Sequence, residues 1–241
     1  MKASETKYSI LHFQFSISRK YHGWTPYHYC KNNPVNRLDP SGYADYITET
    51  ATFSDGIQDN LKFVVSNNAV SQNSIYPDNG AAGPPILNYE SLKATGTFAG
   101  TSKTWEKTTT DVVDNIGKAN EGREDAAAVG ITNDNKGVYS YGGQGIIESG
   151  HTNSSVASEK AINGVISQKA ISSSITLIHS HGVGLELDPS NPKDYNAISQ
   201  FKIQSGIVIN SKKDVNIFGS TPGEKMTIPF KRFDDFMKSK K

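Results

Sequence analysis

The sequence predicts an α/β (α+β) fold, in which a mixed β-sheet is flanked by helices and preceded by an irregular N-terminal extension. From about residue 104, segments with the hydrophobic spacing of helices alternate with short apolar runs typical of strands. Before that point, Gly, Pro, Ser and Asn interrupt the chain repeatedly, which is typical of turns and loops. Hydrophobic residues make up 35% of the 241 positions. That is enough for a core of about 100–150 residues surrounded by loops.

Helices are expected where apolar residues recur at helical spacing. In the second of them, Ile162, Val165 and Ile166 are expected to face the core, with Ser154 or Ser155 as the N-cap. The expected helices are Trp105–Lys118, Val156–Lys169, Asp194–Ile203 and a last one that begins near Phe230. The expected strands are Ala126–Ile131, Gly137–Tyr141, Ser174–Ile178, Gly206–Asn210 and Val215–Phe218.

Composition divides the chain into three zones. Residues 1–42 are aromatic and rich in turn-forming pairs such as Asn-Pro, Asp-Pro and Ser-Gly. Residues 43–103 are expected to be a linker or loosely packed extension, with a possible short strand at Leu61–Val65. Residues 104–241 are expected to form the compact domain.

Bulk composition excludes several classes of protein. The net charge of +1 gives no electrostatic reason to expect a nucleic-acid or membrane surface. The single Cys30 cannot form an intrachain disulfide. No apolar run approaches the roughly 20 residues that a membrane span needs. Residues 1–20 lack the layout of a signal peptide, so any export is expected to use another route.

Two histidines and one aspartate form the strongest functional candidate. His179 and His181 follow the apolar run 175–178, and strand residues two apart point to the same face. Asp194 lies in the first turn of the next expected helix. Two imidazoles and one carboxylate are the usual ligands of a catalytic zinc site, which leaves a fourth position for water. Because zinc lowers the pKa of such a water to about 7, the sequence predicts a metallohydrolase.

This chemistry also needs a general base, and a carboxylate that does not bind the metal fits best. Glu124 stands just before a predicted strand. Glu121, Glu148 and Glu159 are its rivals. Glu159 is expected at a solvated helix position and Glu148 in a Gly-rich loop, but the residues alone do not choose firmly among the four.

Three further side chains are weaker candidates. Ser190 is suited to donate a hydrogen bond to a developing oxyanion, and about equally suited to cap the following helix. Asp188 is a reserve metal ligand. His151, in a polar segment expected to be a loop, is expected to be incidental.

The order of these residues resembles the motif of the JAMM (JAB/MPN) metallopeptidases, over roughly residues 104–220. The resemblance implies a cytidine-deaminase-like mixed sheet, zinc as the cofactor and hydrolysis of peptide or isopeptide bonds. It also implies a role for each matching residue: His179, His181 and Asp194 as zinc ligands, Glu124 as the base and Ser190 as the oxyanion-stabilising serine.

Residues 21–42 carry a second resemblance. Their terminal pattern of Pro34, Asp39-Pro40 and Gly42 is similar to the end of the RHS-repeat-associated core, which a variable toxin domain follows. A JAMM-like domain directly after such a tip resembles the JAB-like toxins of bacterial polymorphic toxin systems. The resemblance implies synthesis in a bacterial cytoplasm, export by a specialised secretion system and action in a target cell. It also implies a protein substrate and a cognate immunity protein.

Two other functions stay open. The gaps from His181 to Ser190 and from Ser190 to Asp194 are each one residue longer than in the family pattern, and Gly182 replaces the usual proline. These departures favour a non-catalytic, metal-free binding domain of the same fold. A metal-dependent nuclease toxin is the third possibility, and the near-neutral charge without clustered Arg argues against it.

Overall fold

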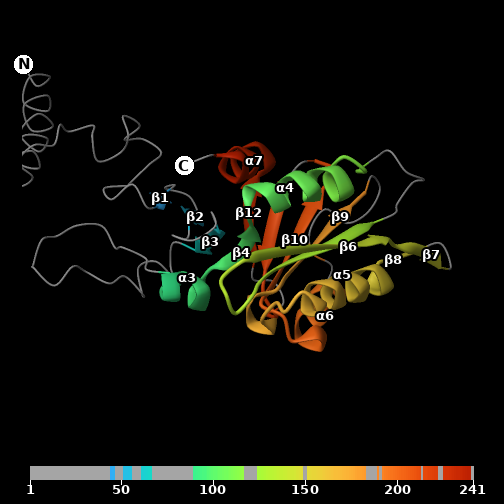
Figure 1. The fold of residues 1–241 in the computed structure, drawn as a ribbon. Coiled ribbons are helices and arrows are strands. Elements are labelled where there is room, and N and C mark those ends of the chain that lie inside the picture. Colours follow the sequence, from blue (N-terminus) through green and yellow to red (C-terminus); the bar gives the residue numbers. More distant parts are fainter. Residues whose placement is uncertain are drawn as a thin grey trace, which may run out of the picture.

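The computed structural model describes residues 44–46, 51–55, 61–66, 89–116, 124–148, 151–182, 189, 192–212, 214–221 and 225–239. A six-stranded sheet in the order β12-β11-β10-β9-β5-β6 forms its centre. Helices α4 and α7 lie on one side of this sheet, and α5 and α6 lie on the other (Figure 1). The expected fold class, a mixed sheet flanked by helices, is confirmed.

The sheet is mixed because β9 pairs in parallel with β10 and antiparallel with β5. Its strands are β5 (Asp125–Ile131), β6 (Gly137–Gln144), β9 (Thr176–His181), β10 (Ser205–Asn210), β11 (Asp214–Phe218) and β12 (Lys225–Pro229). The flanking helices are α4 (Ser102–Thr108), α5 (Ser155–Ser167), α6 (Lys193–Phe201) and α7 (Phe230–Lys238). No helix in the described part of the chain has the length and apolar character needed to cross a membrane.

The core under α4 and α7 also includes residues from the second zone. A four-stranded sheet, β1-β2-β3-β4, comprises β1 (Ala44–Tyr46), β2 (Ala51–Asp55), β3 (Lys62–Ser66) and β4 (Thr97–Gly100), with α3 (Tyr89–Thr95) before β4. Phe63 of β3 and Phe98 of β4 are buried in one cluster with Trp105 and Phe233. The short strand expected near residues 61–65 is therefore confirmed. These residues belong to a packed core rather than to a loose extension, while the division at residues 42 and 103 stays a prediction.

The opposite core lies between the sheet and helices α5 and α6. Ala161 and Val165 of α5 and Ile198 of α6 meet Leu177 of β9 there. Helix α5 approaches β6 so closely that a Cβ at Gly142 would lie 1.8 Å from the carbonyl oxygen of Ala157. A glycine at this position is therefore needed for the helix to pack against the strand.

Helix α4 departs from the expected helix over residues 105–118. It begins at Ser102 and passes into a π-helical turn, η2 (Thr109–Val113). The hydroxyls of three consecutive threonines, Thr108, Thr109 and Thr110, each donate to the carbonyl four residues earlier. Side chains that compete for backbone carbonyls in this way disturb an α-helix, which accounts for the change of helix type.

Other differences are local. The sheet strand begins at Thr176, because residues 172–174 form a 3₁₀ turn, and it extends through the histidines instead of ending before them. Ile166, expected to face the core, is 44% exposed. The Gly-rich run expected as a loop forms the end of β6 and then a hairpin of β7 (Ile146–Glu148) and β8 (His151–Asn153).

Candidate metal centre

Strand β9 presents both histidines to the α5 and α6 side of the sheet. Leu177 belongs to the core on that side and Ile178 to the core on the other. Side chains alternate along a strand, so His179 and His181 follow Leu177 on the same face. Asp194 reaches them from the first turn of α6, where a negative side chain also interacts favourably with the helix dipole.

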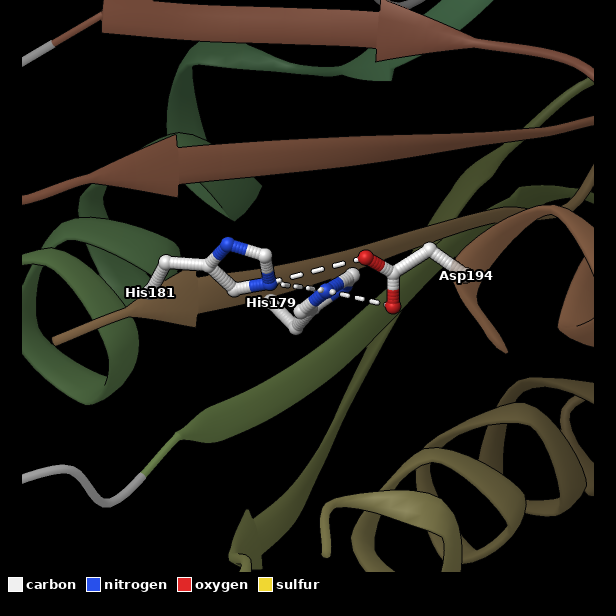
Figure 2. Close-up of side chains that lie close together, drawn as sticks. All are labelled: His179, His181 and Asp194. Carbon is white, nitrogen blue, oxygen red and sulfur yellow. Dashed lines mark hydrogen bonds and ion pairs between the residues drawn. The ribbon is translucent and has the colours of Figure 1, made fainter. Parts of the chain in front are cut away.

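The three side chains converge on one point (Figure 2). The Nε2 atoms of His179 and His181 are 3.2 Å apart. Nε2 of His179 lies 3.3 Å from Oδ1 of Asp194, and Nε2 of His181 lies 3.6 Å from its Oδ2. Both imidazoles are buried, and the Asp194 side chain is 14% exposed. The predicted convergence of these residues is therefore present, and they could hold a metal ion.

These separations suit a tetrahedral metal. With metal–ligand distances of about 2.0–2.1 Å, neighbouring ligand atoms in a tetrahedral site are about 3.3 Å apart. The two imidazole nitrogens are 3.2 Å apart, which is close to that value, and each lies 3.3 or 3.6 Å from a different oxygen of the Asp194 carboxylate. The donor set of two imidazoles and one carboxylate is also the one found in open zinc sites. The residues present therefore fit a metal ion of this kind.

The electrostatics of the cluster also favour a cation. Burial of the His179 ring opposes its protonation, but the nearby carboxylates of Asp194 and Glu124 outweigh this effect and raise the pKa of His179. The negative charge that favours a proton here favours a metal ion equally. Among the described residues, the buried Nδ1 atom of His179 has no hydrogen-bond partner. This nitrogen is the other ring atom and not the Nε2 atom that faces His181 and Asp194.

Glu124 is the described glutamate that joins the cluster. Its Oε1 atom lies 3.8 Å from Nε2 of His181, and its side chain is 15% exposed. Glu159 is exposed on α5, as expected of a solvated helix position. Glu148 lies in β7 and His151 opposite it in β8, so His151 is in a strand and not in the expected loop. Glu121, Asp188 and Ser190 lie outside the described residues.

The sequence patterns did not predict the residues that contact Asp125, next to Glu124, and so support the backbone there. The backbone N–H of Asp125 donates to Oγ of Ser180, and the hydroxyl of Tyr141 donates to the Asp125 carboxylate. Burial raises the pKa of Asp125, while hydrogen bonds from Tyr141 and Asn115 act in the opposite direction. Only their positions in the sequence could have pointed to these residues, because Asp125 follows the predicted base and Ser180 separates the two histidines.

No protein-family model, curated protein or solved structure matches this chain. The residues of the metal centre and the motif resemblances of the sequence are therefore what indicate a function for this chain.

Proposed function

We propose that the chain is a zinc-dependent hydrolase that cleaves peptide or isopeptide bonds in proteins. The observation that carries this proposal is the buried cluster of His179, His181 and Asp194, with a fourth side chain, Glu124, beside it. Three converging ligands from two elements supply a metal site, and the additional carboxylate supplies a base. The identity of the metal as zinc follows from the donor set and from the JAMM resemblance.

Zinc held by the two histidines and Asp194 would act as a Lewis acid on the scissile carbonyl and lower the pKa of a water molecule to about 7. Glu124 would accept the proton of the attacking water. Its Oε1 atom is 3.8 Å from a ligand nitrogen, which places the carboxylate at the edge of the site rather than among the closest contacts. Glu124 then passes the proton to the leaving amine, so one carboxylate carries out both proton transfers.

The proposed substrates and biological setting depend on the sequence resemblances. A domain of this type behind an RHS tip would be a bacterial toxin that is exported by a specialised secretion system and acts on a protein of a target cell. A cognate immunity protein would protect the producer. Ser190, as a hydrogen-bond donor to the oxyanion, stays a prediction from the motif.

The cleavage itself can be tested with proteins extracted from bacterial cells. The zinc-loaded chain is incubated with the extract, and new carboxyl termini are identified by mass spectrometry, because peptide and isopeptide hydrolysis both create them. We expect a reproducible set of new termini that disappears when a chelator removes the metal. Termini that persist unchanged in the chelator would contradict metal-dependent cleavage, and metal binding without any cleavage would favour the non-catalytic domain.

A further inference from the structure

We propose that Ser180, the residue between the two histidines, is a positioning residue that holds Glu124 at the metal centre through the backbone of Asp125. The inference rests on the proposed function, because it gives Ser180 a role only if Glu124 is the base. Ser180 itself has the opposite orientation from the ligands. It alternates with His179 and His181 along β9 and so follows Ile178 on the other face of the sheet.

The pairing of β5 with β9 changes at the metal centre. The two strands pair from Val129 opposite Thr176 to Ala126 opposite His179, and the regular pairing ends there. Continued by one residue, the same register would set Asp125 opposite Ser180. Instead of a backbone carbonyl, the Ser180 hydroxyl accepts the N–H of Asp125, at 2.9 Å. A side chain thus continues the connection between the strands where the regular pairing stops.

This hydrogen bond is protected from water. Asp125 is 2% exposed and Ser180 is 1% exposed. A buried N–H without an acceptor is strongly unfavourable, so the hydroxyl fixes the position of the backbone at the start of β5. Glu124 is the next residue along that backbone, and its side chain follows Ala126 to the face that carries the histidines.

A second contact holds Glu124 from the opposite side. Its carbonyl oxygen accepts the N–H of Gly145, at 2.6 Å, just after the end of β6. The Asp125 side chain is held as well, by a hydrogen bond from the Tyr141 hydroxyl. The backbone around Glu124 is therefore tied to β9 through Ser180 and to β6 through Gly145. Loss of the Ser180 contact would free one side of this attachment and let the carboxylate move away from His181.

The chain offers a closely matched control at the other end of the same strand. The Oγ atom of Ser174 accepts the N–H of Ile131, the last residue of β5, at 3.3 Å. Ser174 is buried too, at 4% exposure. Ile131 lies about 20 Å along the strand from Asp125 at the usual rise per residue. The same hydroxyl can also donate to the carbonyl oxygens of Ile131 and Ile171. Ser174→Ala therefore removes buried serine hydrogen bonds from β5, including the one to an amide, without touching the metal centre.

The experiment compares Ser180→Ala, Ser180→Thr and Ser174→Ala with the wild-type chain, all loaded with zinc. Three quantities are measured: zinc content, amide hydrogen exchange by NMR, and kcat and KM on a synthetic peptide that spans a cleavage site found in the extract. We expect Ser180→Ala to keep its zinc, to exchange the Asp125 amide faster and to lose about 10- to 100-fold in kcat with KM unchanged. Ser174→Ala should instead speed hydrogen exchange at the Ile131 amide and keep the wild-type kcat. Ser180→Thr, which retains a hydroxyl, should restore most of the kcat.

Equal kcat values for Ser180→Ala and Ser174→Ala would overturn the role of Ser180 while leaving the proposed function intact. Loss of zinc from Ser180→Ala would also overturn it, because the hydroxyl would then support the ligands rather than the base. If the threonine variant does not fold, the two alanine variants decide the question alone. A wild-type chain that binds zinc and cleaves nothing would overturn the proposed function and, with it, this inference.

Discussion

Glu124→Gln is expected to keep its zinc and to lose about 10²–10⁴-fold in kcat, which is the usual contribution of a general base. The substitution preserves the size of the side chain and removes its ability to accept a proton. Glu124 is not among the three clustered ligands, and its Oε1 atom lies 3.8 Å from Nε2 of His181. The measurement is the rate of formation of new carboxyl termini, together with the zinc content of the same sample.

Glu159→Gln is the control for that substitution. Glu159 is exposed on α5, so its replacement should leave both kcat and zinc content at the wild-type level. A Glu124→Gln variant that turns over at the wild-type rate would show that another residue is the base. In that case Glu121, a rival candidate for the base, would be the next glutamate to replace.

Trp105→Ala is expected to lower the free energy of unfolding by about 3–5 kcal/mol, as is usual for a large aromatic side chain removed from a core. Trp105 is fully buried in α4 and meets Phe233 of α7 edge to face, with ring centroids 5.0 Å apart. Its Nε1 atom donates to Oδ1 of Asp234, also in α7, at 2.9 Å. One side chain therefore joins the two helices on the face opposite the metal centre. Urea denaturation followed by circular dichroism measures the effect.

Trp105→Phe separates the two contributions to this packing. The phenyl ring keeps much of the aromatic contact with Phe233 and loses the hydrogen bond to Asp234, so its cost should be clearly smaller than that of alanine. The folded fraction of either variant should still bind zinc, because the ligands lie on the other face of the sheet. A loss of less than about 1 kcal/mol in Trp105→Ala, the level of an ordinary substitution, would contradict this account of the core.

The sequence predicted those parts of the fold that depend on local patterns. The alternation of apolar residues in the third zone located most elements of the central sheet and its helices, and the His-x-His spacing placed both imidazoles on one face. Ile166 is exposed although its helical spacing matches that of the buried Ile162 and Val165. The π-helical turn after Thr108 follows from hydrogen bonds of threonine hydroxyls, which hydrophobic spacing does not show. The packing of β3 with α4 and α7 depends on contacts between residues far apart in sequence, which no local pattern contains.

The candidate site, too, was predictable from the sequence only in part. Asp194 was predictable because it lies at the start of the helix that follows the histidine strand along the chain. The position of Glu124 beside His181 depends on the register of β5 on β9, which no local sequence pattern contains. The hydrogen bond from Asp125 to Ser180 depends on the point at which that pairing ends, so sequence spacing gave no indication of it.

Binding of one metal ion by His179, His181 and Asp194 can be tested by measuring the metal content of the purified chain with elemental mass spectrometry. Wild-type protein is compared with His181→Ala and with the control His151→Ala, whose residue lies in β8. We predict about one zinc per chain in the wild type and in His151→Ala, and none in His181→Ala. Absence of metal from the wild type after zinc is supplied, or full retention in His181→Ala, would contradict metal binding by these residues.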